Sequence, residues 1–343
     1  MKNFILFSWI LLCLLVYVES TGFEWFPKPP TLPKSWYKKH VEQEWLKYPV
    51  DVVSEDADDD EEDTGDEDSD KKDSDEYVAN RSSGLYDEEP ELWPCLYKKC
   101  RGKSQSPINI DTEIITSDSK LGPLMFKNYD IPIHDVLLKN TGYAIYIFIP
   151  RSAGAMVSSE WLGSNKYRLY LIRLSYGKTN KNGSGHSIDS KYFPLEVSLY
   201  HLNTKYKNLE DKFDSTLALS ILHKIDKENK ALKVVTESVK KIKKIDSNTT
   251  AKSELTLKDL LPSHLDYYIT YNGSRLVPPC SEYRKWIIFH YPGSVSKGQL
   301  EKFRTVDSKK GNRELNVVRP TQPLNDRKII SSKPIKDEKE DWW

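Results

Sequence analysis

The chain has 343 residues, and its 51 lysines and arginines balance 51 aspartates and glutamates. This balance hides an uneven distribution, because residues 51–76 hold 16 acidic side chains and only two lysines, a local charge of −14. The remainder therefore carries +14. So acidic a segment cannot bury enough apolar surface to fold by itself, whereas the rest is long enough for one core.

The first 20 residues have the pattern of a signal peptide. Lys2 precedes an apolar run from Phe4 to Val18, and Val18 and Ser20 occupy the minus-three and minus-one positions of a cleavage site. No later stretch is long and apolar enough to span a bilayer. We therefore expect a secreted, extracellular protein with no membrane span.

Composition divides the chain into four parts. We expect a signal peptide over 1–20, a disordered Asp-rich arm over 21–83, a folded domain over 84–331 and a polar tail over 332–343. Dense, flexible carboxylates bind Ca²⁺ weakly and in number, so residues 51–76 are a candidate calcium-binding segment. The alternative is a solubilising tail that screens the basic remainder.

Three segments have the pattern of β-strands, because apolar and polar residues alternate along them and β-branched or aromatic residues are frequent. They are residues 143–150, 167–177 and 195–202. Within the second segment, Arg173 and Ser175 share one face, since side chains two apart on a strand point the same way. For an isolated strand, the simplest interpretation is that this polar face meets solvent.

Residues 229–244 have the pattern of an amphipathic helix. Leu232, Val235, Val239 and Ile242 recur at spacings of three and four residues, which places them on one face and the lysines on the other. An ordinary solvated surface is a simpler interpretation of the lysine face than a dedicated binding patch.

The cysteines and glycosylation motifs fit an oxidising compartment. Outside the signal peptide the chain has three cysteines, so we expect one disulfide and one remaining thiol. The cysteines are Cys95, Cys100 and Cys280, and the candidate glycosylation sites are Asn80, Asn182, Asn248 and Asn272.

Five segments occur in the order and nearly the spacing typical of α-carbonic anhydrases, which the chain resembles from about Gly84 to Ile330. The segments are CRGKSQSPINI (100–110), GHSIDSKYFPLEVSLYHLNTKY (185–206), LLPSHLDYYITYNGSRLVPPC (260–280), VSKGQLEKFR (295–304) and VRPTQPLNDRKI (318–329). The resemblance implies a mainly β (α+β) fold, in which a large, twisted, mostly antiparallel sheet carries short surface helices and a conical pocket.

The same resemblance assigns the disulfide. Secreted members of the family often join the cysteine before the QSP segment to the one after the PP pair, which implies a bond between Cys100 and Cys280. Cys95 is then the remaining thiol, and an exposed Cys95 would allow a disulfide-linked dimer.

Active members of this family hold Zn²⁺ with three histidines, and the resemblance places those three positions on Arg173, Ser175 and Ser198. Arginine cannot ligate a metal and a serine hydroxyl is a poor neutral ligand, so we expect no zinc and no catalysis. Arg173 and Ser175 would then point into the former catalytic pocket. A guanidinium group would replace the charge of the metal there.

The other catalytic positions of the family are replaced as well. The resemblance matches Leu276 to the threonine that orients the zinc-bound hydroxide, Gly185 to the acidic partner of that threonine, and Tyr143 to the proton-shuttle histidine. His186 and His201 match positions that are structural in the family.

Glu196 matches the carboxylate that orients a ligand histidine in the family. Two alternatives follow for Arg173. It forms a buried ion pair with Glu196, or it recognises an anion, with Arg275 nearby.

Three functions compete on these grounds. The first is a catalytically inactive, secreted module that binds an extracellular polyanion such as a sulfated glycosaminoglycan, or a matrix protein. The second is a calcium-binding biomineralisation matrix protein, whose acidic arm contacts a mineral surface. The third is an active zinc carbonate dehydratase, against which the replaced ligands argue. We expect no nucleic-acid partner.

Overall fold

The computed structural model describes residues 90–206, 212, 214–308 and 319–334. The predicted signal peptide, the acidic arm and most of the polar tail lie outside the described residues. Short helical segments are few in the described ranges. The α-helices are α3 (Trp93–Leu96), α4 (Lys233–Ser238) and α5 (Lys297–Phe303).

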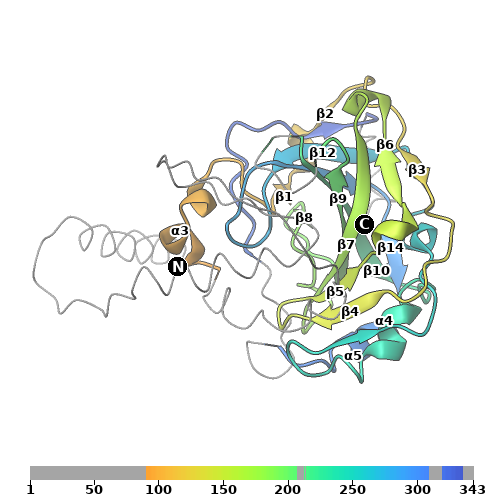
Figure 1. Cartoon of the computed structure of the whole chain (residues 1–343). Coiled ribbons are helices and arrows are strands. Elements are labelled where there is room, and N and C mark those ends of the chain that lie inside the picture. Colours follow the sequence, from red (N-terminus) through yellow and green to blue (C-terminus); the bar gives the residue numbers. More distant parts are fainter. Residues whose placement is uncertain (1–89, 207–211, 213, 309–318, 335–343) are drawn as a thin grey trace, which may run out of the picture.

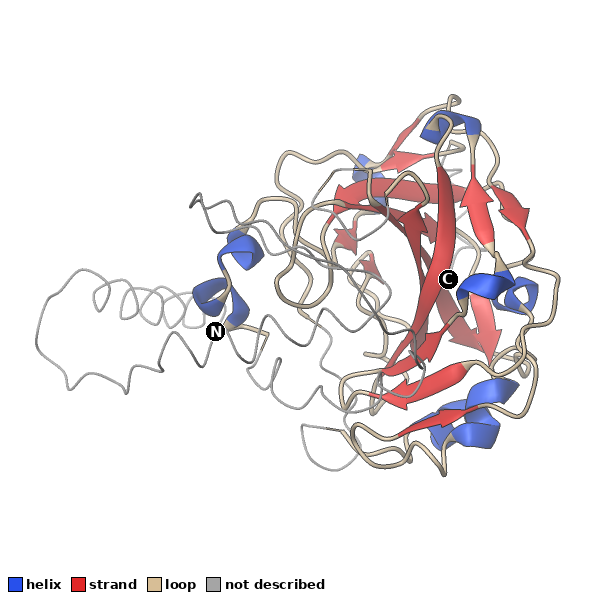
Figure 2. Ribbon diagram, viewed as in Figure 1, coloured by secondary structure: helices blue, strands red, loops and turns tan. Residues whose placement is uncertain are grey.

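A large twisted sheet of 13 strands dominates the part of the chain that the structure describes (Figures 1 and 2). The main path of neighbouring strands is β11 (Asn248–Thr250), β4 (Leu137–Asn140), β5 (Ile145–Phe148), β7 (Lys166–Tyr176), β9 (Leu195–Asn203), β10 (Thr216–Ile225), β13 (Arg284–Phe289), β12 (Tyr268–Gly273), β15 (Ile330–Ser331) and β2 (Thr116–Ser117).

Five further short strands complete the β-structure. Strand β14 (Gly293–Val295) pairs with β10, and β6 (Met156–Ser158) joins β3 (Met125–Lys127) to β7. Strands β1 (Asn109–Ile110) and β8 (Ser187–Ile188) form a separate two-stranded sheet.

Most neighbouring strands are antiparallel, as the resemblance implied, so the predicted mainly β fold class is confirmed. The exceptions in the large sheet are the parallel pairs of β10 with β13 and β14, and of β15 with β2. The main path ends in β11 and β2, which have three and two residues.

Apolar side chains cover both faces of the central strands. On one face Ile172 and Leu199 belong to a large core that also takes in residues of α4 and α5. On the other face Tyr200 and Trp286 belong to a second cluster. Because the sheet is covered on both sides, Arg173 and Ser175 of β7 are buried, and the interpretation that their face meets solvent is wrong.

The predicted helix over 229–244 is much shorter in the structure, where only Lys233–Ser238 is α-helical. Its apolar residues are nevertheless buried as expected. Two β-branched valines lie at its start, and no side chain caps its N-terminus, so the local sequence supports a helix weakly. The lysines that follow the helix are exposed: Lys240, Lys241, Lys243 and Lys244.

Candidate functional site

The three positions matched to zinc ligands lie together on one face of the sheet. Arg173 and Ser175 are two residues apart on β7, and Ser198 of β9 lies directly opposite Arg173 in the antiparallel register. Side chains two apart, or directly opposite, share a face of a sheet. All three residues are at least 97% buried, with exposed fractions of 3%, 1% and 0%.

These side chains do not fit a zinc ion. A guanidinium group cannot ligate a metal, and two neutral hydroxyl groups are weak ligands for Zn²⁺. In the described ranges, moreover, no group of three or more histidine, cysteine, aspartate or glutamate side chains is arranged to hold a metal. The side chains at the three matched positions therefore differ in kind from zinc ligands.

Beside these positions, Glu196 of β9 is the centre of a buried hydrogen-bond network. Its Oε2 accepts from the backbone N–H groups of Gly185 at 2.8 Å and His186 at 3.0 Å. Its Oε1 accepts from His186 Nδ1 at 2.8 Å, from Ser220 Oγ at 2.7 Å and from Ser198 Oγ at 3.4 Å. Burial alone would raise the pKa of Glu196, but the charge and hydrogen bonds of His186, with Ser220, lower it to about 2.

This network corrects one of the two alternatives for Arg173. Glu196 Oε1 lies 2.8 Å from His186 Nδ1, and among the described residues Glu196 forms no ion pair with Arg173. A carboxylate offers about four lone-pair positions, and five donors already share those of Glu196. The carboxylate is therefore satisfied without the arginine.

The network continues from His186 toward the start of the domain. His186 Nε2 lies 2.7 Å from the hydroxyl oxygen of Tyr271, which lies 2.8 Å from Ser106 Oγ. Ser106 and Ser274 then exchange two hydrogen bonds, each between one backbone N–H and the other residue's hydroxyl. The network thereby joins the loop at Ser106, the loop at His186, strand β9 and the end of strand β12.

Three arginines line a small cavity on the same face of the sheet, with a volume of about 50 Å³. They are Arg173 of β7, Arg275 in the loop after β12, and Arg284 of β13. Their exposed fractions are 3%, 8% and 6%. Leu276, which the resemblance matched to the catalytic threonine of the family, also lines the cavity.

Three tyrosines form much of the remaining wall: Tyr146, Tyr170 and Tyr200. Tyr146 lies opposite Arg173 in the pairing of β5 with β7. Tyr170 is the extra residue of a β-bulge in β7, which lets it face the cavity together with the next residue, Leu171. Burial raises the pKa of Tyr170 and of Tyr200, although the nearby arginines oppose this, so both hydroxyl groups are protonated at neutral pH.

The arginines differ in how they are held. The guanidinium carbon of Arg284 lies 4.4 Å from the ring centre of Tyr200 and 5.9 Å from that of Trp286, which indicates cation–π contacts. Its Nε also lies 3.5 Å from Thr216 Oγ1. Arg173 makes neither a hydrogen bond nor an ion pair with any described residue, and its Nε is buried.

The structure distributes the other predicted site residues over different places. Tyr143 does not line the cavity, but packs with Trp93 against the disulfide. His201 lies on the opposite side of β9 from Ser198, where its Nε2 is 2.6 Å from the Tyr129 hydroxyl and burial lowers its pKa to about 3. Gly185 contacts Glu196, as described above.

Of the four candidate glycosylation sites, three fall on described residues. Asn182 and Asn272 are exposed, and Asn248 is partly buried. Asn80 lies outside the described residues.

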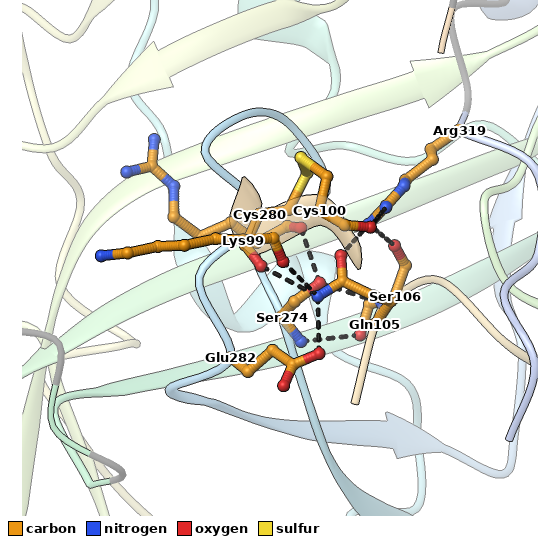
Figure 3. Close-up of a disulfide and its surroundings, with 9 residues drawn as sticks. Lys99, Cys100, Gln105, Ser106, Ser274, Cys280, Glu282 and Arg319 are labelled. Carbon is orange, nitrogen blue, oxygen red and sulfur yellow. Dashed lines mark hydrogen bonds between the residues drawn. A yellow bond between two sulfur atoms is a disulfide. The ribbon is translucent and has the colours of Figure 1, made fainter. Parts of the chain in front are cut away.

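The disulfide between Cys100 and Cys280 that the resemblance implied is present, whereas Cys95 is half-buried and forms no disulfide with another described residue. Figure 3 shows how Gln105 and Arg319 surround it. Gln105 donates to the carbonyl groups of Lys99 and Cys280 and to the Glu282 carboxylate. Arg319 donates to the Gln105 side chain and to the carbonyl groups of Ser106 and Cys100.

Sequence reasoning missed Arg284 and the three tyrosines of the cavity. Arg284 stands two residues before Trp286 on β13, so alternation places it on the face of the second apolar cluster. Strand β5 pairs with β7, and β13 follows β9 and β10 on the other side of β7. This strand order joins segments far apart in the chain, and no local pattern contains it.

Comparisons with known proteins agree with this architecture. The family described as eukaryotic-type carbonic anhydrase matches residues 88–333. The human and rat proteins named carbonic anhydrase-related protein are each 30% identical to this chain over 249 residues, covering 68% of this chain and 85% of the relative. Mouse carbonic anhydrase 15 is 29% identical over 275 residues, covering 74% of this chain and 85% of the relative.

No helix of the described residues is long and apolar enough to cross a membrane. The family match spans most of the chain and takes in the sheet, the disulfide and the arginine-lined cavity. The chain belongs to the eukaryotic-type carbonic anhydrase family.

Proposed function

We propose that this protein is a secreted, catalytically inactive member of the carbonic anhydrase family that acts as an extracellular binding module for polyanions. The observation that carries the loss of catalysis is the buried set Arg173, Ser175 and Ser198. It puts a cation and two hydroxyl groups where the family resemblance calls for three imidazoles. The names of the human and rat relatives, which say carbonic anhydrase-related, support the same view.

Metal analysis and an activity assay test the first part of this proposal. We expect no stoichiometric zinc in the purified protein and no hydration of carbon dioxide above the buffer rate. One zinc per chain with sulfonamide-sensitive activity would overturn it and favour a zinc carbonate dehydratase.

A triple variant provides the matched gain-of-function test. In Arg173→His with Ser175→His and Ser198→His, three imidazoles share one sheet face, so zinc binding should return. Activity should lag behind, because Leu276 offers no hydroxyl group at the position of the catalytic threonine. If the triple variant binds no zinc at micromolar concentrations, the assignment of the three positions is wrong.

The basic part of the chain supports the polyanion partner. Outside residues 51–76 the chain carries +14, and the exposed lysines after α4 add a dense local positive charge. A polyanion such as a sulfated glycosaminoglycan gains from such a surface by releasing counterions, and its affinity falls as salt rises.

Titration with heparin tests this partner. We expect the intact protein to bind heparin in low salt, and replacement of Lys240, Lys241, Lys243 and Lys244 by glutamine to weaken binding at least tenfold. Four glutamines at lysines elsewhere, Lys120, Lys178, Lys191 and Lys258, all exposed, are the matched control. Equal affinity in both variants would show that the lysines after α4 are an ordinary solvated surface.

A calcium-binding role in a mineralised matrix is the second candidate, because residues 51–76 hold 16 carboxylates. The arm should also attract the basic part of the chain at low salt, within a Debye length of about 10 Å at 0.1 M. Deleting the arm should then remove most weak Ca²⁺ uptake and raise heparin affinity, and Ca²⁺ added to the intact chain should mimic the deletion. Unchanged heparin affinity in both cases would leave the arm as a solvated tail.

A further inference from the structure

We propose that the arginine-lined cavity binds a small tetrahedral oxyanion, sulfate or phosphate, either as the free ion or as a terminal ester group. The site is built by Arg173, Arg275 and Arg284 from three separate segments. The proposal does not depend on polyanion binding by the surface lysines, which belong to a different part of the molecule.

The first argument is charge balance. An arginine side chain keeps its positive charge in proteins, so three cations lie within one small volume. Among the described residues no aspartate or glutamate lines the cavity, and neither Arg173 nor Arg284 forms an ion pair. Glu196, on the neighbouring strand β9, is engaged by His186. Buried charges are stable when an opposite charge and hydrogen bonds satisfy them, so the cavity favours an anion.

The second argument is the supply of hydrogen-bond donors. Arg173 is 97% buried and makes no hydrogen bond with any described residue, although its guanidinium group carries five N–H donors. Within the same described set, the hydroxyl groups of Tyr146, Tyr170 and Tyr200 also make no hydrogen bond, and all three residues line the cavity. Forked guanidinium donors match the oxygen edges of sulfate and phosphate.

The third argument is size. A single water molecule needs about 10–15 Å³ of such a cavity. A volume of about 50 Å³ therefore suits an ion of four or five heavy atoms. A sugar ring or a peptide side chain with its backbone is too large, so a polysaccharide could place only a single sulfate group inside.

The test measures the stability and heat of binding of the full chain, with its disulfide intact, in sodium sulfate or sodium phosphate at constant ionic strength set by sodium chloride. We expect saturable stabilisation of the wild type, as for any ligand that binds only the folded state. Sulfate also stabilises proteins non-specifically, but that effect rises steadily with sulfate concentration instead of saturating, and it should be equal in all variants.

Three variants locate the site. Arg173→Met should weaken sulfate binding at least tenfold, whereas Arg151→Met, at an exposed arginine, should leave it unchanged. Leu276→Glu places a carboxylate in the cavity wall, so it should abolish sulfate binding while raising the melting temperature in sulfate-free buffer. This variant keeps the test decisive if Arg173→Met does not fold.

Two results would overturn the proposal: no saturable response in the wild type, or the same saturable response in the wild type, Arg173→Met and Leu276→Glu. Methyl sulfate distinguishes the two sources of the anion. Affinity within threefold of that for sulfate would assign an ester group, and affinity at least tenfold weaker would assign the free ion.

Discussion

Glu196 and Arg173 lie on neighbouring strands, on one face of the same sheet, and both are almost completely buried. Their surroundings differ sharply. Every oxygen of Glu196 is matched by donors from His186, Ser220 and the backbone, whereas Arg173 has no such partner among the described residues. A buried charge with all its partners holds a fold together, and one without partners points to a ligand.

The strongest test of this contrast is Glu196→Ala. The substitution leaves His186 and two backbone N–H groups buried without an acceptor, so we expect a loss of about 3–5 kcal/mol in the free energy of unfolding, measured with urea. Ser220→Ala removes a single donor and should cost only about 1 kcal/mol. A loss below about 1 kcal/mol for Glu196→Ala would mean that the network does not stabilise the fold.

The disulfide secures the far end of the same network, because Gln105, next to Ser106, donates to the Cys280 carbonyl. The bond joins residues 180 apart, and a long closed loop restricts the unfolded chain strongly. Replacing Cys100 and Cys280 by serine should lower the free energy of unfolding by about 2–5 kcal/mol.

Cys95→Ser is the matched control for the disulfide and should change stability by less than about 1 kcal/mol. The same variant tests the predicted dimer, since a reducible dimer should appear on gels for the wild type and disappear in Cys95→Ser. A change as large as that of the double variant would show that Cys95 matters for folding.

Lowering the pH should destabilise the fold through its buried histidines and Glu196, whereas the cavity arginines keep their charge. Burial lowers the pKa of His223 and of His290 to about 4, below the usual 6.5, so the unfolded chain takes up these protons first. The contribution of these two histidines to the free energy of unfolding is therefore complete above pH 6.5 and is lost as the pH falls toward 4. Glu196, with its pKa lowered from 4.5 to about 2, adds a further loss between those values. Arginine does not titrate in this range.

Urea unfolding midpoints between pH 8 and pH 4 measure this slope. His290→Phe keeps a ring stacked on Tyr267, whose centre lies 3.8 Å away, and removes one titrating group, so the midpoint should fall less steeply. His134→Phe replaces an exposed histidine by the same residue and serves as the matched control. Equal slopes in all three proteins would contradict the assignment to His290.

The smallest effect is expected at the cavity itself. In sulfate-free buffer Arg173→Met should be neutral, or stabilising by up to about 1 kcal/mol, because it removes an uncompensated buried charge. Arg319→Met is the informative control, since Arg319 is equally buried but donates hydrogen bonds to Gln105, Ser106 and Cys100. That variant should lose at least about 2 kcal/mol. A similar loss in both variants would remove the distinction between the two kinds of arginine.

Local patterns were enough to predict three neighbouring strands of the large sheet, β5, β7 and β9. The segments 143–150, 167–177 and 195–202 overlap β5, β7 and β9 with ends that differ by at most two residues, because alternation records which side chains meet a core. The helix over 229–244 was predicted too long, since its apolar spacing is satisfied by one short helix and the turns beside it.

The cavity depended on information that no single segment holds. The resemblance could place Arg173 on a face of the sheet. Arg284 and Tyr146 come to the same cavity only through the order and register of the strands β5, β7, β9, β10 and β13. For the same reason the sequence could not identify the hydrogen-bond partner of Glu196, since His186 approaches it from the loop that precedes β9.

The ends of the sheet have a consequence for assembly. A long, flat outer strand can template the addition of a strand from a second molecule, which begins fibrous aggregation. At the two ends of the main path here, β11 and β2 offer three and two residues, so such an addition would gain only a few backbone hydrogen bonds. As far as the described residues are concerned, we therefore expect copies that associate to do so through side-chain surfaces or the Cys95 thiol rather than by lengthening the sheet.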